Sequence, residues 1–388
     1  MHIVVFPGWY PSNVDRLSGD FIQRHMYAIA QNCTVSVVFP IKDSSIKKKK
    51  IVTSRKDNLT EIYYYYPSLV SIKWIDNLLS FIRYNYYCVK TVKSLSKVEK
   101  IAIAQLYVLQ KNFLIGFLLK KIYNIPYVVS EQSTLYIDGG FEQMNWLKKA
   151  AYTWVFRNSH SYHAVSAYLL KALKTKMHLN KEGVIIPNVV DSNLFYYNKD
   201  LTSEQVIFAH VSNMLYQKNV EGMLQAFAEV KKIKTNFVLN LVGLMPESVH
   251  DLINQLNLSE HVIIWNERMY NEVAEILQQS DVFVFFTRYE TFGCVIIEAN
   301  ACGLPVIVSD LEVTRELISD QLNGVLVQSE NVEDLSKKIL FMMNNLQNFD
   351  PLAISLETKR RFNYTVIGNL FYNWFNQQTK LVGSKIDG

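Results

Sequence analysis

Cysteine is scarce in this sequence, which has four in 388 residues, namely Cys33, Cys88, Cys294 and Cys302. They form no Cys-x-x-Cys pair and no cysteine–histidine spacing of a metal site, so neither a zinc site nor a disulfide framework is expected. A reducing cytosol fits this usage best. Glycine and proline number only 14 and 9, and hydrophobic residues make up 49% against 19% charged ones. This composition is that of a globular protein and excludes a collagenous or disordered chain.

Long apolar runs are absent as well. The N-terminus enters a strand-like run at once and lacks the basic and long apolar stretches of a signal peptide, so export is not expected. The most apolar window, 101–119, is interrupted by four polar residues, whereas a membrane-spanning helix needs about 20 mostly apolar ones. We therefore expect a cytoplasmic protein whose only attachment to the inner face of the cell membrane is peripheral.

Basic residues are concentrated in one part of the chain. The formal net charge is +5, but residues 41–100 contain thirteen Lys and Arg against five Asp and Glu, a net +8 that leaves −3 for the rest. The densest runs are the four lysines at 47–50 and the segment 73–100. Such a patch favours an anionic partner. No helix-turn-helix, zinc or RNA-binding pattern accompanies it, so nucleic acid is not the expected partner.

The segment 73–100 allows two interpretations. A helix packed on a sheet is one, because apolar side chains recur at helical spacing at Ile72, Ile75, Leu79, Ile82, Tyr86 and Val89. A membrane surface is the other, because cations and aromatic rings suit the headgroup region and occupy the remaining face at Lys73, Trp74, Arg83, Tyr84, Tyr87, Lys90 and Lys93.

Short β-branched runs alternate with amphipathic segments, a pattern typical of a parallel sheet covered by helices. In the first half we expect strands at 2–7, 34–40, 101–108, 126–132, 161–166 and 184–188, and helices at 20–31, 74–96, 112–123, 143–157 and 167–175. In the second half we expect strands at 206–212, 236–243, 262–266, 281–286, 305–310 and 324–327, and helices at 219–233, 247–256, 270–279 and 294–302. The predicted fold class is α/β, with two Rossmann-like, doubly wound parallel-sheet domains.

The polar segment 188–201 is the expected linker, which gives an N-terminal domain of residues 1–188 and a C-terminal domain of residues 189–362. A last helix, at about 363–388, is too apolar for a free tail and should dock back to complete the first domain, since it carries Phe371, Tyr372, Trp374 and Phe375 at helical spacing. Two such domains usually bind their ligand in the cleft between the carboxyl ends of their sheets.

The most informative stretch reads DVFVFFTRYETFGCVIIEANACGLPVIVSD. A buried strand, a polar loop and a helix follow one another, so Thr291, Phe292 and Gly293 present backbone amides at a helix N-terminus, which binds anions and hydroxyl oxygens. Glu290 lies before the helix and Glu298 about one turn inside it, so both carboxylates can face one cleft. A carboxylate accepts two hydroxyl hydrogen bonds at once, as a ribose or a sugar requires.

These residues resemble the Glu-x7-Glu signature of retaining glycosyltransferases of family 4, which have the GT-B fold of two Rossmann domains. Glu290-Thr-Phe-Gly and Glu298-Ala-Asn-Ala-Cys-Gly-Leu-Pro-Val carry the resemblance. Other pieces arrive in the family's order: a glycine-bearing first loop at 8–19, Ile-Pro-Asn-Val-Val-Asp at 186–191, Lys218-Asn, and Glu316 with Asn323-Gly324. The resemblance covers nearly the whole chain and implies a GT-B fold with the active site in the interdomain cleft.

The resemblance also implies roles. Glu298 would bind the ribose of the donor, and Glu290 with the amides at 291–293 would hold the transferred sugar. Lys218 would neutralise the diphosphate, because a fixed cation stabilises the charge that develops on a leaving phosphate. Glu290 and Lys218 are therefore the expected catalytic residues. Gly19 would let its backbone approach the same phosphate.

Two positions depart from the family pattern. Asn213 stands where the family commonly has an arginine, five residues before the lysine, and is a donor-binding candidate. Gln132 stands where a histidine is frequent and would supply a neutral contact to the sugar. None of the fifteen aspartates is spaced Asp-x-Asp, so no metal and no other cofactor is expected, and lysine and helix-terminal amides carry the diphosphate.

Structural explanations compete with these roles. In isolation, two acids eight residues apart are more often a solvated loop residue and a helix charge, and a lone lysine is a surface residue; the flanking Phe-Gly and Ala-x-x-x-Gly-x-Pro pieces favour a site. A sugar-nucleotide epimerase or phosphorylase, and a non-catalytic sugar-nucleotide-binding protein, share the architecture. We expect a retaining glycosyltransferase.

The acceptor expected is a lipid-linked saccharide at the cytoplasmic face of a membrane, as in assembly of a bacterial surface polysaccharide. In the family the first domain usually takes the acceptor, and here that domain holds the basic excess. Residues 47–50 and 73–100 would then contact an anionic membrane surface. The sequence names neither the base nor the sugar of the donor.

Overall fold

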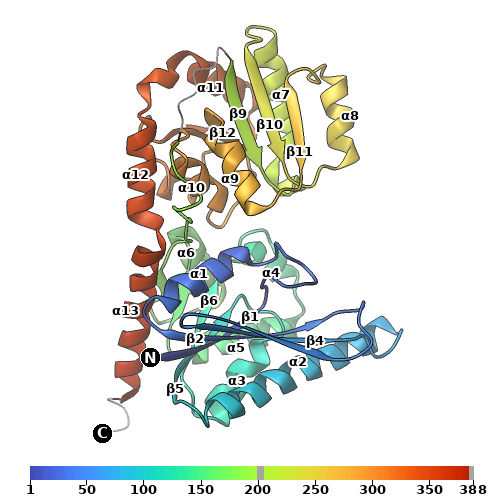
Figure 1. The fold of residues 1–388 in the computed structure, drawn as a ribbon, viewed down its shortest axis with the longest axis vertical. Coiled ribbons are helices and arrows are strands. Elements are labelled where there is room, and N and C mark those ends of the chain that lie inside the picture. Colours follow the sequence, from blue (N-terminus) through green and yellow to red (C-terminus); the bar gives the residue numbers. More distant parts are fainter. Residues whose placement is uncertain (199–204, 384–388) are drawn as a thin grey trace. The chain divides into compact units, whose positions relative to one another are not determined.

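The computed structural model describes residues 1–198 and 205–383. The chain divides into two compact units, Met1–Val189 with Tyr364–Gly388, and Val190–Asn363 (Figure 1). Parts of two predicted segments, 199–201 of the linker and 384–388 of the last helix, lie outside the described residues. Both units contain a mostly parallel sheet covered by helices, so the predicted α/β fold class is confirmed.

The sheet of the N-terminal domain has the strand order β3-β4-β2-β1-β5-β6-β7-β8 and is parallel except for the pair β3 and β4. Its strands are β1 (His2–Pro7), β2 (Thr34–Lys42), β3 (Lys50–Lys56), β4 (Leu59–Tyr66), β5 (Ile101–Tyr107), β6 (Tyr127–Glu131), β7 (Tyr162–Ala164) and β8 (Val184–Ile185). The central strand β1 is buried along its whole length, as expected for an apolar run covered on both faces. The helices are α1 (Asp20–Ala30), α2 (Lys73–Leu95), α3 (Phe113–Lys121), α4 (Gly140–Gln143), α5 (Trp146–Asn158), α6 (Ala167–Lys176) and α13 (Tyr364–Gly383).

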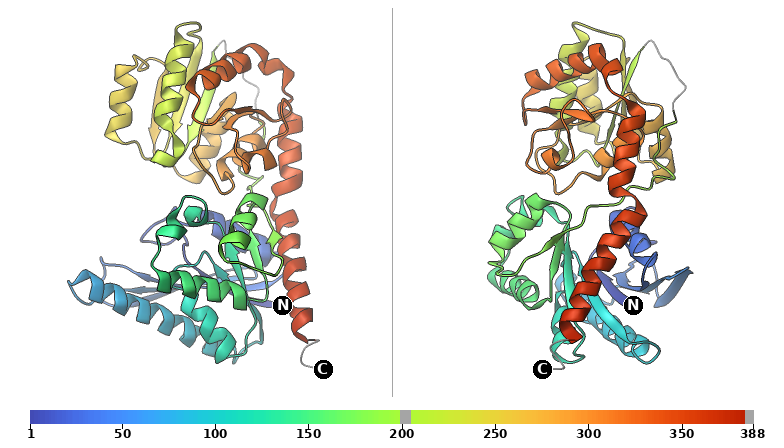
Figure 2. Two further views of the ribbon diagram at one scale, coloured as in Figure 1. Left: turned by 180° about the vertical axis from the view of Figure 1, so that it is seen from behind. Right: turned by 90° about the vertical axis from the view of Figure 1, so that its left-hand side faces the viewer.

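The last helix, α13, belongs to the core of this domain. Its buried side chains join the apolar cluster of β1 and α1, namely Ile367, Phe371, Trp374 and Phe375. Gly368 lets α13 cross α1 closely, because a Cβ at this position would lie 2.3 Å from the carbonyl oxygen of Ala28. Figure 2 shows α13 lying along the N-terminal domain.

The C-terminal domain has a wholly parallel sheet in the order β11-β10-β9-β12-β13-β14. Its strands are β9 (Val206–Val211), β10 (Phe237–Val242), β11 (Val262–Asn266), β12 (Val282–Phe285), β13 (Val306–Ser309) and β14 (Gly324–Val327). The α-helices are α7 (Val220–Lys231), α8 (Glu247–Gln255), α9 (Tyr270–Gln278), α10 (Cys294–Ala301), α11 (Val332–Asn345) and α12 (Pro351–Phe362). The strand order reverses between β9 and β12, and in open sheets of this kind ligands bind at such a switch point.

Several elements were not predicted from the sequence, among them β3, β4, α11 and α12. The hairpin of β3 and β4 lies at the edge of the N-terminal sheet, and β3 is exposed along most of its length. Its lysines and arginine are typical of an edge strand, which needs charge to stay unpaired. Because these charged residues belong to the basic stretch 41–100, the sequence shows no apolar run or alternation that would predict the strand.

Candidate active site

Lys218 and Glu290 follow β9 and β12, the two neighbouring strands at the switch point of the C-terminal sheet. Lys218 ends the short 3₁₀ turn η2 (Tyr216–Lys218) between β9 and α7, and Glu290 lies in the loop between β12 and α10. These connections are 72 residues apart in the sequence. The parallel sheet brings them together because both leave its carboxyl edge.

The two side chains form a buried ion pair. The Nζ of Lys218 lies 2.7 Å from the Oε2 of Glu290, and the side chains are 14% and 11% exposed. Burial by itself raises the pKa of Glu290, but the Lys218 ammonium and the backbone N–H groups of Thr291 and Phe292 outweigh it and hold the pKa below its usual value. At neutral pH the site therefore holds a carboxylate and an ammonium in contact.

The helix α10 begins directly after this pair. Its N-cap, Gly293, has φ 92°, a left-handed conformation that favours glycine, and a Cβ there would lie 2.8 Å from the side chain of Ile296. The N–H of Thr291 donates to the Oε1 of Glu290 at 2.9 Å. Thr291 and Phe292 are buried. The predicted amide-bearing loop thus precedes the helix as expected, and its contact with a sugar stays a prediction.

Hydrogen bonds that the sequence did not reveal join the two connections. The backbone N–H of Arg288 and the hydroxyl of Thr287 both donate to the carbonyl oxygen of Gln217, at 2.8 and 2.9 Å. The guanidinium of Arg288 lies 4.0 Å from the ring centroid of Tyr216 and 2.6 Å from a carboxylate oxygen of Glu221. These contacts fix the turn that carries Lys218 against the loop that carries Glu290.

Beneath the pair, His210 ties β9 to β12. This fully buried imidazole contacts the carbonyl oxygen of Val284 through Nδ1 and the hydroxyl of Ser212 through Nε2, both at 2.8 Å. The pKa of His210 is lowered to about 4, chiefly by burial and to a smaller extent by the nearby Lys218 ammonium, while the bond to Val284 acts in the opposite direction. The imidazole is therefore neutral at physiological pH.

Glu298 and Asn213 lie in different surroundings. Glu298 is 3% exposed, and its Oε1 accepts a hydrogen bond at 2.7 Å from the hydroxyl of Tyr270, at the start of α9. Asn213 follows β9, in the same connection as Lys218, and is exposed. Its Oδ1 accepts the N–H of Leu215 at 3.4 Å. Tyr270 had no motif to single it out, although it too follows a strand of the parallel sheet.

In the N-terminal domain, Gly19 caps α1 with φ 75°. A Cβ at this position would lie 2.7 Å from the backbone of Trp9, so the loop itself requires glycine. Gln132 follows β6 and is 6% exposed, and its Nε2 donates to the hydroxyl of Tyr107 at 2.7 Å. Its side chain is thus engaged within the domain. The roles expected for both residues toward a ligand stay predictions.

Next to Gln132, Glu131 is fully buried and accepts the backbone N–H groups of Leu109, Gln132 and Ser133 at 3.2, 2.9 and 2.9 Å. Burial raises the pKa of this carboxyl to about 7, although the three N–H groups act in the opposite direction. No motif singled out Glu131 beforehand, since an acid at a strand end is ordinarily exposed.

The predicted faces of α2 are correct only in part: Lys73, Trp74, Lys90 and Lys93 are exposed as expected, but the aromatic and apolar positions differ. Ile82 and Tyr86, expected in the core, are 54% and 58% exposed, whereas Tyr84 and Tyr87, expected outside, are 3% and 7% exposed. The reason is that the sheet offers polar partners: Lys42 pairs with Asp76 at 2.8 Å, and the hydroxyls of Tyr66 and Ser80 lie 3.0 Å apart. The helix therefore buries a mixed face instead of its apolar one.

The outer side of α2 carries an apolar ridge of side chains spaced four residues apart, which are Trp74, Leu78, Ile82 and Tyr86, at 70%, 52%, 54% and 58% exposure. Exposed cations on the same helix are Lys73, Lys90 and Lys93. The lysine run 47–50 lies beside this helix, since the Nζ of Lys49 is 5.7 Å from the ring centroid of Tyr87.

Across the described ranges, 1–198 and 205–383, no helix is long and apolar enough to cross a membrane. Within the same ranges no group of three or more His, Cys, Asp or Glu side chains is arranged to hold a metal ion. Independence of a metal stays a prediction.

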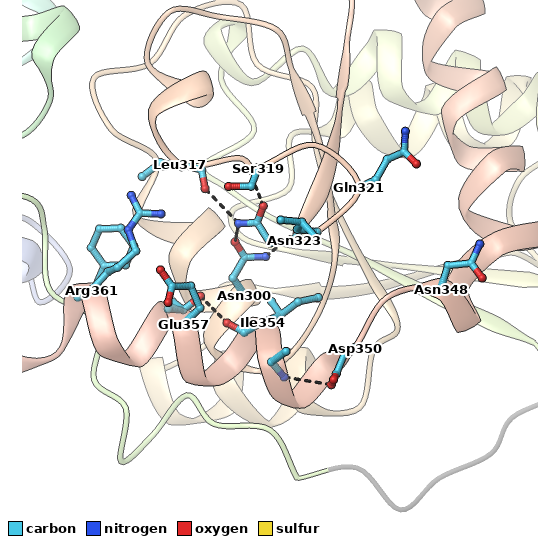
Figure 3. Close-up of a pocket in the computed structure, with 14 residues that line it drawn as sticks. Asn300, Leu317, Ser319, Gln321, Asn323, Asn348, Asp350, Ile354, Glu357 and Arg361 are labelled. Carbon is cyan, nitrogen blue, oxygen red and sulfur yellow. Dashed lines mark hydrogen bonds between the residues drawn. The ribbon is translucent and has the colours of Figure 1, made fainter.

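A cavity of about 300 Å³ lies at the other end of α10 (Figure 3). The side-chain amides of Asn300 and Asn323 meet at its wall, where the Nδ2 of Asn323 donates to the Oδ1 of Asn300 at 3.0 Å. Arg361 of α12 also lines this cavity. Lys218, Glu290 and Glu298, which were predicted to form the donor site, do not line it.

Residues 197–354 match the family model described as glycosyl transferases group 1. A relative from Campylobacter jejuni, an N,N'-diacetylbacillosaminyl-diphospho-undecaprenol alpha-1,3-N-acetylgalactosaminyltransferase, is 28% identical over 256 residues, covering 61% of this chain and 66% of the relative. The chain spans 62%, 66% and 45% of the lengths of the first three curated relatives, less than two thirds of each.

Solved structures are similar over both domains. Sucrose-phosphate synthase from Thermosynechococcus elongatus has a TM-score of 0.78 at 16% identity, covering 97% of this chain and 99% of its own. Anabaena HepE, in complex with UDP and glucose, has a TM-score of 0.71 at 16% identity, covering 97% and 100%. These likenesses confirm the GT-B fold of two parallel-sheet domains. The matched family model, glycosyl transferases group 1, spans residues 197–354 and so includes both members of the Lys218–Glu290 pair.

Proposed function

We propose that this protein is a retaining glycosyltransferase, which moves a sugar from a nucleotide-diphosphate donor to a saccharide acceptor. The observation that carries the proposal is the buried Lys218–Glu290 pair at the switch point of the C-terminal sheet, directly before α10. A cation, a carboxylate and the amides of a helix N-terminus in one place suit a sugar diphosphate. The family match of this domain and the glycosyltransferase names of its relatives support the same activity.

In the proposed reaction, the acceptor hydroxyl attacks the anomeric carbon on the face from which the diphosphate leaves. The bond between the acceptor oxygen and the anomeric carbon forms as the bond from that carbon to the phosphate oxygen breaks. The departing phosphate oxygen takes the proton of the acceptor hydroxyl, and the Lys218 ammonium stabilises the charge that develops there. Retention itself is supported by the resemblance of Glu290 and Glu298 to the Glu-x7-Glu signature.

The proposal assigns Glu298 to the donor ribose and Glu290, with the amides at 291–293, to the transferred sugar. The position of Glu298 in the second turn of α10 and its bond from Tyr270 support a fixed acceptor of hydroxyl hydrogen bonds. UDP in the Anabaena structure supports a nucleotide diphosphate as the donor's leaving group.

For the acceptor we propose a lipid-linked saccharide at a cytoplasmic membrane surface, in assembly of a bacterial surface polysaccharide. The diphospho-undecaprenol in the name of the Campylobacter relative supports this class. The apolar ridge of α2 and the lysines at 47–50 support peripheral contact with an anionic bilayer, since cations meet the headgroups and apolar side chains enter the interface.

Incubation of the full chain with labelled sugar nucleotides and a lipid-linked saccharide tests the activity. Nucleotide release that depends on acceptor, with a product of the donor's anomeric configuration, is the expected result. Release together with an altered free sugar would indicate an epimerase, and binding without turnover a non-catalytic protein; an inverted product would remove the retaining assignment. Activity should persist in EDTA, and loss restored by magnesium or manganese would contradict the metal-free donor site.

A further inference from the structure

A second group of cations lies in the N-terminal domain, at the carboxyl edge of its sheet. Lys42 is the last residue of β2, and Lys111 lies in the connection between β5 and α3. Arg83 of α2 lies over the ring of Tyr66, the last residue of β4, with its guanidinium carbon 4.6 Å from the ring centroid. In this sheet the strand order reverses between β1 and β5, so the loop that holds Lys111 leaves the switch point where a ligand is expected.

These cations outnumber the acids around them. Lys42 pairs with Asp76 at 2.8 Å, and the same carboxylate accepts the N–H of Leu69 at 2.9 Å. The Nζ of Lys111 donates only to the hydroxyl of Ser80, at 3.0 Å, and has no carboxylate within ion-pair distance among the residues that the structure describes. One carboxylate therefore serves two ammonium groups.

The surroundings of Lys111 disfavour its charged form. Partial removal from water lowers its pKa, and the neighbouring Lys42 lowers it further, while Asp76 acts in the opposite direction. A cation that is partly desolvated, next to a like charge and without a carboxylate of its own, is stabilised by an anion that binds there. The lysine side chain remains exposed enough to meet such an anion.

The apolar ridge lies on the opposite side of the same helix turns. Asp76 and Ser80 of α2 face the sheet and the lysines, whereas Trp74 and Leu78 face solvent. Figure 1 shows α2 beside α3. Lys111 lies two residues before the first residue of α3, Phe113. An anionic group at the lysines is thus one helix width from a surface suited to a hydrocarbon chain.

We propose that Lys42 and Lys111 bind the phosphate or diphosphate group of an amphiphilic acceptor whose apolar chain lies along Trp74 and Leu78. This inference rests on the proposed glycosyltransferase function, which it deepens by assigning the anionic part of the acceptor to named residues. It separates two diphosphate sites, one at Lys218 for the donor and one at Lys111 for the acceptor.

The probes are farnesyl diphosphate, inorganic pyrophosphate and farnesol, titrated into the full chain by calorimetry. Farnesyl diphosphate should bind at least about tenfold more tightly than either of the other two. Lys111→Met should weaken farnesyl diphosphate binding about tenfold, Lys111→Arg should restore most of it, and Lys121→Met, which removes an exposed charge of the same domain, should leave it unchanged. Equal binding of farnesyl diphosphate by wild type and Lys111→Met would overturn the proposal.

Further measurements distinguish a lipid diphosphate from free phosphate, and the Lys111 site from the donor site at Lys218. Pyrophosphate that binds as tightly as farnesyl diphosphate would indicate a free phosphate ligand and overturn the lipid assignment. Lys218→Met should keep farnesyl diphosphate binding, and its loss in that variant would place the anion at the donor site instead. Nucleotide binding by Lys111→Met should equal that of wild type. A chain that binds farnesyl diphosphate as described but turns over no sugar nucleotide would refute the proposed function and leave the anion site standing.

Discussion

Glu290 and Glu298 are both buried acids near one helix start, yet their partners differ. Glu290 is neutralised by Lys218, and Glu298 accepts a hydroxyl hydrogen bond from Tyr270. A residue that touches the transferred sugar acts mostly in the transition state, while a ribose contact is present in the ground state as well. With the roles proposed above, alteration of Glu290 should lower turnover, whereas alteration of Glu298 should weaken nucleotide binding.

We predict that Glu298→Ala weakens nucleotide binding about tenfold, or ~1.4 kcal/mol, with a small change in turnover. Glu290→Gln should instead lower kcat by about 100-fold, or ~2.7 kcal/mol, with nucleotide affinity nearly kept. Calorimetry with nucleotides and steady-state kinetics measure the two effects. Glu260→Ala, at an exposed acid of the same domain, is the control. Wild-type kinetics in both folded variants would mean that the site is misplaced.

The buried carboxyl of Glu131 predicts a pH dependence of stability. Its pKa of about 7 lies above the ordinary value of 4.5, so between these pH values the folded state keeps a proton that the unfolded state has lost. The stabilising contribution is therefore complete below about pH 4.5, is lost as pH rises to about 7, and amounts to roughly 3 kcal/mol.

His163 and His210 oppose this trend, because burial lowers the pKa of each to about 4 and their contribution grows as pH rises toward 6.5. The measurement is therefore the difference between wild type and Glu131→Gln in urea unfolding from pH 4.5 to 8. The wild type should lose stability relative to the variant across this range and level off above pH 7. Parallel curves would contradict the prediction.

Among the elements, α2 shows what sequence periodicity reveals and what it leaves open. Apolar residues at helical spacing predicted a helix at 74–96, and the structure has one at Lys73–Leu95. The spacing did not reveal which face packs inward, since that depends on what the sheet offers. Here β4 presents Tyr64 and Tyr66 to the helix, and their hydroxyls pair with Thr91 and Ser80 of α2.

We predict that α2 binds anionic vesicles through both its ridge and the neighbouring lysines. The triple variant Trp74→Ser, Leu78→Ser, Ile82→Ser should lose the vesicle binding that persists at high salt, because each apolar side chain buried in the interface contributes about 1.5–3 kcal/mol. Glutamate at Lys47, Lys48 and Lys49 should remove the salt-sensitive part, about 1 kcal/mol per lysine. Sedimentation with vesicles at low and high salt measures both.

The ridge side chains are exposed, so the triple variant should keep the melting temperature of wild type. Unchanged sedimentation of both variants would show that α2 does not face a membrane.

At the scale of the whole chain, each domain has its own apolar cluster, and the N-terminal one is completed by a helix from the other end of the sequence. Phe371 of α13 is fully buried against His25 and His163, with ring centroids 4.9 and 5.2 Å away. We predict that Phe371→Ala destabilises the N-terminal domain by about 3–5 kcal/mol.

Tyr372→Ala, at a 37% exposed position of the same helix, should be nearly neutral. Calorimetric unfolding measures the difference, and nucleotide binding at the C-terminal domain should survive in the Phe371 variant. A nearly neutral Phe371→Ala would contradict the core role of α13.

Much of the fold followed from local patterns, because buried parallel strands such as HIVVFP read as continuous apolar runs. The site followed only in part. Glu290 and the glycine that starts α10 lie in one recognisable stretch, but Arg288 and His210 act through contacts between distant connections, which one sequence cannot reveal. The ion pair with Lys218 depended on strand order, and strand order is a property of the folded sheet.

The exposed edge strand β3 has a consequence for association between copies of the chain. An antiparallel encounter of two β3 strands centred on Thr53 would set Lys50 of one copy opposite Lys56 of the other, so like charges now oppose edge-to-edge growth. Reversing the charge of Lys50 would turn that repulsion into attraction and create a self-complementary seam. Lys50→Glu should therefore favour pairing of copies through β3, and a sedimentation-velocity comparison with wild type at the same concentration measures this.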